Sequence, residues 1–289
     1  MVGNGFWQQF KRQRAALIGG AWIGVLTLVA IAGPLLRPDP TRYANDQHLA
    51  WSLLPPGAQV ELPDGDTRTF LLGTDRYGRD FLSRLMAGSS ISLGVGAMAV
   101  LISLLIGVPL GAYAGYRGGW PDALIRWVIQ VVWTLPTVLM VLAIALAFGK
   151  GLVQIFIAIG LTMWVDVARV VRGVVLSIKE ETYIEAARGL GLSTPVILRR
   201  HVLPNAMGPI LVLAASNFAT AILVEAGLSF LGVGAQIPAP SWGNIVQAHS
   251  HMITGAHAHL ALAPCLLIVS VVLGFTFLGD GLRAVLDRH

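Results

Sequence analysis

The chain has 289 residues, of which 55% are hydrophobic and only 12% are charged, and its mean hydropathy is +0.71. Soluble domains carry about a quarter charged residues, so this composition excludes an ordinary soluble protein and predicts one embedded in a membrane. The single cysteine, Cys265, excludes an intramolecular disulfide framework and a cluster of thiolate metal ligands. The net charge of +5 does not indicate nucleic-acid binding, because Lys and Arg gather at the ends of hydrophobic segments.

Six hydrophobic runs are long enough to span a bilayer as helices. The first, about 15–36, is interpreted as a retained helix, because it is longer than a signal-peptide core and no small-residue cleavage pattern follows it. A polar, proline-rich segment of about fifty residues comes next, at 37–87. The sequence therefore predicts an all-α integral membrane protein with six transmembrane helices. The later five are expected at about 88–116, 121–148, 152–173, 205–233 and 259–283.

The distribution of Lys and Arg predicts how these helices are oriented. If the N-terminus is cytoplasmic, most of the positive charge falls on the cytoplasmic side, as known membrane proteins require. The last outer loop, 234–258, then contains no Lys, Arg, Asp or Glu. Both termini and the polar stretch 178–204 are therefore expected in the cytoplasm.

That polar stretch between the fourth and fifth hydrophobic runs has the pattern of two short helices joined by a turn. A first helix is expected at about 178–190, and Gly191 is suited to the left-handed position that follows a helix end. Thr194 and Pro195 then read as the N-cap and first residue of a second helix. Pro204 is expected to end that helix before the next span.

The same stretch carries a specific spacing. Glu-Ala-Ala at 185–187 is followed by Gly191 and then by Leu-Pro, twelve and thirteen residues after that glycine. This spacing resembles the EAA loop of bacterial ABC importer permeases, in which it forms coupling helices that dock in a cleft of the ATPase. Two residues before that leucine, His201 stands where an aliphatic residue is usual. A histidine at this position resembles the peptide-importer branch of the family. The resemblance implies the following ATPase-coupling residues: Glu185, Ala186, Ala187, Gly191, Leu203 and Pro204.

A second stretch, Leu-Gly-Thr-Asp followed by Gly-Arg-Asp and Ser-Arg at 72–84, resembles the extracytoplasmic signature of dipeptide, oligopeptide and nickel permeases. Asp75/Arg79 and Asp80/Arg84 have the i,i+4 spacing of helical ion pairs, each worth about 0.2–0.5 kcal/mol. One interpretation is that these four residues only decorate a helix surface at the bilayer edge. The other is a candidate extracytoplasmic gate or contact for a binding protein.

The resemblance covers most of the chain from residue 72 to 289, and it continues through Glu-Ala-Gly-Leu-Ser-Phe-Leu-Gly at 225–232, Ser-Trp-Gly at 241–243 and Leu-Gly-Asp-Gly-Leu-Arg at 278–283. It implies the C-type permease subunit of a peptide-type importer with the type I permease core. Three parts are then expected. They are a cytoplasmic N-terminus with the first helix at 1–36, an extracytoplasmic segment at 37–87, and the transmembrane domain at 88–289.

Three further features leave alternatives open. Glu225 is the deepest acid of the fifth span, and it is either structural, path-lining or in contact with another subunit. Four histidines lie in or beside one outer loop, and imidazole is a ligand for several transition metals. The preferred interpretation is that these are incidental polar residues rather than a metal site, so no metal ligand is predicted. Three glycines spaced four apart in the second span predict a face for close helix packing or a heterodimer seam. The histidines are His249, His251, His257 and His259, and the glycines are Gly107, Gly111 and Gly115.

No catalytic motif is present in the sequence. Gly149-Lys150 is followed by Gly151, so there is no phosphate-binding loop of the form G-x-x-x-x-G-K-[ST]. No catalytic residue and no cofactor bound by this chain are therefore expected. The resemblance implies that two P-loop ATPase subunits bind ATP and Mg. It also implies a second homologous permease subunit as heterodimer partner and an extracytoplasmic solute-binding protein, with membrane lipid around the helices and no nucleic acid.

The function implied is ATP-driven import of di- and oligopeptides across the cytoplasmic (inner) membrane. Within the same family, the cargo is alternatively nickel, glutathione or another small solute. In a different class, the chain is a membrane scaffold or receptor that transports nothing. An integral-membrane enzyme is disfavoured, because no pair of intramembrane acids or histidines has catalytic spacing.

Overall fold

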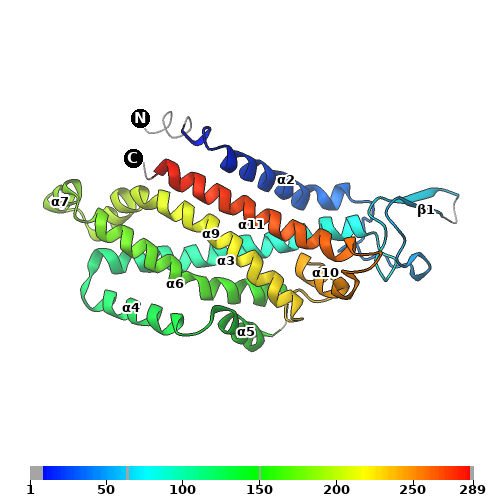
Figure 1. Cartoon of the computed structure of the whole chain (residues 1–289). Helices are drawn as coiled ribbons and strands as arrows, with labels where there is room; N and C mark the ends of the chain where they lie inside the picture. The colour runs from blue at the N-terminus through cyan, green and yellow to red at the C-terminus, as the bar shows by residue number, and fades with distance from the viewer. Residues whose placement is uncertain (1–8, 63–64, 150, 287–289) are drawn as a thin grey trace.

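The computed structural model describes residues 9–62, 65–149 and 151–286. Within these residues, five helices are long and apolar enough to cross a membrane. They run side by side as one elongated bundle (Figure 1). Four of them are α2 (Arg14–Leu36), α3 (Phe81–Arg117), α6 (Leu152–Ile178) and α11 (His259–Leu286). The other is the continuous helix Thr194–Phe230, most of which is α9 (Leu203–Phe230).

The expected third span, 121–148, is not one straight helix. It is divided into α4 (Gly119–Trp133) and α5 (Thr137–Phe148), which are bent by 94° relative to each other. The cause is Pro136, which has no N–H to donate and disfavours helical backbone at the residue before it. A sixth span is present only if α4 and α5 together form one bent crossing.

Helix α3 begins earlier than the sequence suggested, at Phe81 rather than at about residue 88. The Asp80 side chain sets this start, since its Oδ1 accepts a hydrogen bond from the Ser83 N–H at 2.6 Å. The expected boundary at 87/88 between the extracytoplasmic segment and the transmembrane domain therefore lies inside a helix.

The glycine stripe of α3 packs against α6 of the same chain. A Cβ atom added at Gly111 would lie only 2.9 Å from the Cα of Ala168, and one added at Gly115 would lie 2.8 Å from the carbonyl oxygen of Arg172. The two backbones can approach this closely because glycine has no side chain. The packing role is thus confirmed, and the partner is an internal helix rather than a second subunit.

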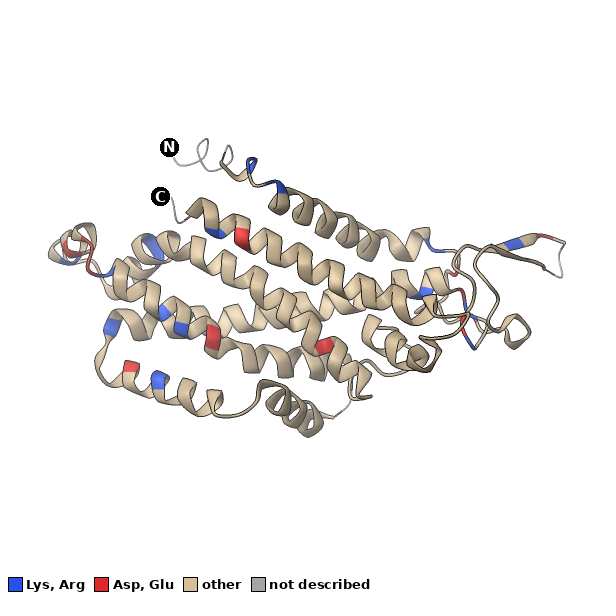
Figure 2. Cartoon of the chain, in the orientation of Figure 1, with Lys and Arg blue, Asp and Glu red and all other residues tan. Residues whose placement is uncertain are grey.

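The two ends of the bundle differ. At one end lie a two-stranded antiparallel hairpin, β1 (Ala58–Glu61) with β2 (Thr67–Phe70), and the short helix α10 (Trp242–His249). At the other end lie the short helix α7 (Thr182–Gly189), the start of α2 and the end of α11 (Figure 1). Most Lys and Arg lie near the α7 end or in the segment around the hairpin, and few charges lie between (Figure 2).

Candidate functional site

Helix α7 projects from the bundle at the end where α2 begins and α11 ends (Figure 1). Ile184 and Ala187 face inward and are buried in a cluster that includes Val171 and Val175 of α6. Glu185 and Ala186 face outward and are exposed. The helix is shorter than the expected 178–190, because α6 continues to Ile178 and the chain then turns before Thr182.

The turn after α7 has the geometry predicted for it. Gly191 has a φ of +77°, and its N–H donates to the carbonyl of Arg188 at 2.9 Å. The N–H of Leu192 donates to the carbonyl of Ala187 at 3.2 Å. These two bonds form a Schellman motif, which requires a left-handed residue at Gly191. The glycine at the helix end is therefore confirmed.

The second helix differs from the prediction at both ends. Ser193 is its N-cap, so Thr194 already lies inside α8 (Thr194–Ile197). At the other end, α8 passes through a π-helical turn at 198–202 directly into α9, and Pro204 stands in the first turn of α9. Because a proline ring clashes with the carbonyl four residues earlier, a widened turn just before it relieves that conflict. Pro204 therefore does not end the helix, and α8 continues into α9.

Three side chains on this segment leave apolar surface in solvent. Tyr183 is 42% exposed, Leu190 81% and Leu192 38%. Exposed large hydrophobic side chains on an otherwise polar segment, here α7 and the turn after it, are typical of a surface that binds another protein. Of the predicted coupling residues, four are exposed, Leu203 is half-buried, and Ala187 is buried. The exposed four are Glu185, Ala186, Gly191 and Pro204.

Polar contacts that the sequence did not reveal hold this end together. Arg188 of α7 donates from Nε to the hydroxyl of Tyr116 at 3.0 Å, and its guanidinium lies 4.9 Å from the centre of that ring. Asp122 of α4 accepts two hydrogen bonds from Arg172 of α6, one of them at 2.8 Å from Nη2. Both pairs join residues at least 50 positions apart, so no local pattern could have paired them.

Replacing Gly191 with proline is expected to abolish function while sparing insertion. Proline fixes φ near −65°, so it cannot adopt +77°, and it also removes the N–H that bonds Arg188. The measurement is the ATP-driven uptake that the resemblance implies, at matched protein levels in the membrane. Gly189 of α7, which is exposed and has open space around it, offers a matched control as Gly189→Ala. Uptake by Gly191→Pro at the level of that control would contradict the assigned turn.

The four residues of the second motif are buried, not displayed on a helix surface. Asp75, Arg79, Asp80 and Arg84 are 1%, 6%, 1% and 7% exposed. Asp75 and Arg79 do form an ion pair, with Nη2 and Oδ2 2.6 Å apart, but in a turn that precedes α3. Asp80 caps α3, and Arg84 instead donates to the carbonyls of Tyr43 and Pro238, both at 3.0 Å.

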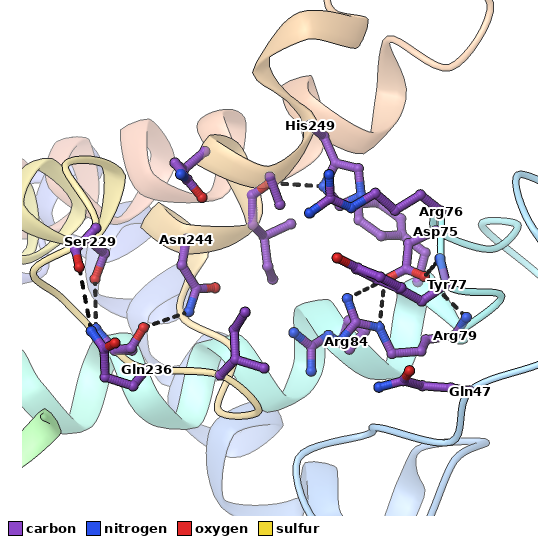
Figure 3. A pocket seen from close by; sticks show the side chains of 17 residues that line it. Gln47, Asp75, Arg76, Tyr77, Arg79, Arg84, Ser229, Gln236, Asn244 and His249 are labelled. Atoms are coloured by element: carbon purple, nitrogen blue, oxygen red, sulfur yellow. Dashed lines mark hydrogen bonds and ion pairs between the residues drawn. The ribbon is translucent and has the colours of Figure 1, made fainter.

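These contacts give the second motif a structural task. Arg84 bonds two loops to the start of α3, one that precedes α3 in the chain and one that follows α9. The motif also lines a cavity of about 390 Å³ together with α10 and the loop before it (Figure 3). Surface decoration is therefore wrong as an interpretation. Nothing in the structure bears on contact with a binding protein, which stays a prediction.

Glu225 lies inside the chain and is 0% exposed. Its two carboxyl oxygens accept hydrogen bonds from Ser92 of α3 at 3.1 Å and from Ser229 at 2.7 Å. Those hydroxyls in turn accept from the backbone N–H groups of Trp242 and Ala235. In this structure Glu225 therefore neither lines an open path nor faces another subunit, and it joins α3 and α9 to the start of α10 and the loop before it.

Replacing Glu225 with leucine is expected to destabilise the folded chain by about 1–3 kcal/mol for each hydroxyl that loses its acceptor in the interior. Glu225→Gln keeps one acceptor, the amide oxygen, and nearly the same side-chain size, so it should cost less. The measurement is the thermal midpoint of the detergent-solubilised protein, followed by size-exclusion chromatography. Equal midpoints for leucine, glutamine and wild type would show that this network carries no stability.

The four histidines do not gather into one site. His249 is buried, and its ring lies edge-on to Phe81, with ring centres 6.1 Å apart. His259 packs on Phe81 in the same way at 6.0 Å, and His257 lies 6.3 Å from His259. Among the described residues, no group of three or more His, Cys, Asp or Glu side chains is arranged to hold a metal ion.

Comparison with known proteins agrees with this architecture. A family model described as binding-protein-dependent transport system inner membrane component matches residues 107–289. A second, described as the N-terminal TM domain of oligopeptide transport permease C, matches residues 3–56. The similarity thus extends through the first helix, beyond the part that its motifs alone had indicated.

The chain is 36% identical over 283 residues to a glutathione transport system permease protein, GsiD, of Pectobacterium atrosepticum, covering 98% of this chain and 89% of that one. It is 38% identical over 281 residues to a dipeptide transport system permease protein, DppC, of Bacillus subtilis, covering 97% and 84%. A chain of the MetNI methionine ABC transporter in an inward-facing form shares the fold with a TM-score of 0.58. That match is 21% identical and covers 71% of this chain and 96% of that one. This chain therefore belongs to the binding-protein-dependent inner membrane components, the non-catalytic permease subunits of ABC importers.

Proposed function

We propose that this chain is the C-type permease subunit of an importer that moves di- and oligopeptides into the cytoplasm, driven by separate ATPase subunits docked on α7. The observation that carries the proposal is the geometry of α7. Its outer face, with Glu185 and Ala186, is exposed, while Ile184 and Ala187 are buried against the bundle. A partner that binds the outer face acts directly on buried transmembrane packing.

Two routes lead from α7 into the spans. Ile184 and Ala187 share one buried cluster with Val171 and Val175 of α6. On the other side, a turn of three residues, 191–193, leads into α8, from which the helix continues through the π turn into α9 without a break. A displacement of α7 is therefore transmitted to both α6 and α9. ATP can drive that displacement only through a difference in its affinity for the two states of the ATPase.

The proposal extends to the orientation of the chain and to its partners. The α7 end, where α2 begins and α11 ends, is assigned to the cytoplasm, because it carries the proposed docking surface for the ATPases (Figure 1). ATP and Mg are bound by those two subunits. A second permease chain of the same family completes the path. The opposite end, with the motif that contains Asp75, Arg79, Asp80 and Arg84, receives solute from an extracytoplasmic binding protein.

Peptides are the proposed cargo because the relatives are named for dipeptide, oligopeptide and glutathione transport. The test is uptake into proteoliposomes that contain this chain, its partner permease, both ATPases and the binding protein. Substrates are labelled di- to pentapeptides, glutathione and Ni²⁺. ATP-dependent accumulation of peptides is expected. Accumulation of Ni²⁺ alone, or of glutathione alone, would show that this solute is the cargo instead of di- and oligopeptides. Failure of the chain to copurify with ATPase subunits would favour a membrane scaffold that transports nothing.

A further inference from the structure

The cavity at the end opposite α7 has an excess of positive charge. Among the described residues that line it are three arginines, Arg76, Arg79 and Arg84, but one acid, Asp75. That acid is already used, since it pairs with Arg79. The volume of about 390 Å³ lies within the range of pockets that hold small molecules, about 300–1,000 Å³.

Arg84 is a buried arginine of this cavity. It is 7% exposed, and it donates hydrogen bonds to two neutral carbonyls, those of Tyr43 and Pro238. No ion pair joins it to a carboxylate in the described part of the chain. A buried guanidinium is normally paired with an anion, because an unpaired buried charge is costly. Its planar fork is suited to bind a carboxylate through two hydrogen bonds.

The opposite wall of the cavity offers an acceptor. His249 is 2% exposed, and its Nδ1 lies 2.9 Å from the carbonyl oxygen of Ile245. A carbonyl can only accept, so Nδ1 carries the proton and Nε2 presents a lone pair. That Nε2 is buried without a hydrogen-bond partner. Burial also lowers the pKa of His249, which keeps the ring neutral and Nε2 an acceptor.

A ligand that fits both groups carries a carboxylate and, some distance away, an N–H. Figure 3 shows Arg84 and Arg79 on one side of the cavity and His249 on the other, with Tyr77 between them. We propose that this cavity binds a short peptide by its terminal carboxylate, with Arg84 as the carboxylate ligand and His249 accepting a peptide N–H. This assignment rests on the proposed function, since it gives the peptide a first site in the permease.

The test is direct binding without transport. The complete complex of this chain with its partner permease and ATPases is held in lipid nanodiscs, without ATP and without the binding protein. Equilibrium dialysis then compares labelled alanyl-alanine with its C-terminal amide. The amide should bind about tenfold or more weakly, because it lacks the charge-assisted bonds to Arg84. Equal binding of acid and amide by wild-type protein would overturn the proposal without any variant.

Three variants sharpen the result. Arg84→Gln should bind alanyl-alanine about tenfold more weakly and lose its preference for the acid over the amide. His249→Phe keeps an aromatic ring against Phe81, so it should weaken binding but preserve that preference. Arg42→Gln, an exposed arginine of the preceding loop that does not line the cavity, is the matched control and should behave as wild type.

The outcomes separate this proposal from the broader function. Peptide uptake in proteoliposomes together with equal binding of acid and amide would retain the transport function and reject the site. Absence of peptide uptake would reject the function itself. If Arg84→Gln weakens attachment of the binding protein but not of alanyl-alanine, the cavity receives an acidic side chain of that protein, and the peptide site is rejected.

Discussion

Replacing Glu185 with lysine is expected to abolish ATP-driven uptake while the amount of inserted protein stays unchanged. The side chain is exposed on the outer face of α7, so its replacement disturbs no buried packing. The new positive charge would instead lie at the surface proposed to bind the ATPase, where reversal of a charge across an interface costs several kcal/mol. The ATPases should then hydrolyse ATP without transport or fail to copurify. The measurements are uptake, ATP hydrolysis and copurification on the same preparation.

The matched control is Glu180→Lys. Glu180 is also acidic and its side chain is 74% exposed, but it lies in the turn before α7 rather than on the helix. Its replacement makes the same change in net charge at the same end of the molecule. Uptake should therefore survive in Glu180→Lys. A well-expressed Glu185→Lys variant that transports normally would remove α7 as the site where ATPase movement enters the permease.

Replacing Gly111 with alanine is expected to separate α3 from α6 and to lower the stability of the whole domain. The added methyl carbon would overlap the backbone of Ala168, which cannot move aside as a flexible side chain can. Overpacking of this kind costs about 1–3 kcal/mol, and here it affects the face that α3 and α6 share. The thermal midpoint of the detergent-solubilised complex should fall by several degrees, as followed by size-exclusion chromatography.

Gly94 lies in the same helix and provides the control. A Cβ atom added there has open space around it, so Gly94→Ala should leave the midpoint unchanged or raise it slightly, because alanine is the better helix former. The pair therefore compares identical chemical changes that differ only in their surroundings. Equal midpoints for Gly94→Ala and Gly111→Ala would show that the glycine stripe is not needed for close packing.

Several features of the polar stretch 178–204 were predictable from residues that are neighbours in the sequence. The left-handed turn at Gly191 follows from a glycine at a helix end, and the motif around Glu185 has a spacing specific enough to indicate the family. The limits of the helices were less accurate. Pro204 looked like a helix end, yet the π turn before it lets the helix continue into α9. That accommodation involves the backbone of a whole turn, which residue preferences do not describe.

The motif at 72–84 shows a different limit of prediction from sequence. Four charged residues at i,i+4 spacing look the same in sequence whether they lie on a wet helix surface or inside a loop. Their burial comes from the partners of Arg84, which are carbonyls at Tyr43 and Pro238, 41 and 154 positions away. Ser92, which bonds to Glu225, is separated from it by 133 positions. Contacts between residues so far apart in the sequence cannot be predicted from the pattern around either residue.

By itself, the sequence determined the membrane class, most of the spans, the permease family and the turn at Gly191. Each of these depends on hydrophobic length, on composition or on the geometry of a few consecutive residues. Only the tertiary structure decided that α4 and α5 are strongly bent, that Glu225 is internal, and that Arg84 and His249 face one cavity. The physical reason is that burial and hydrogen bonding depend on which distant segments pack together, and that packing is a property of the whole bundle.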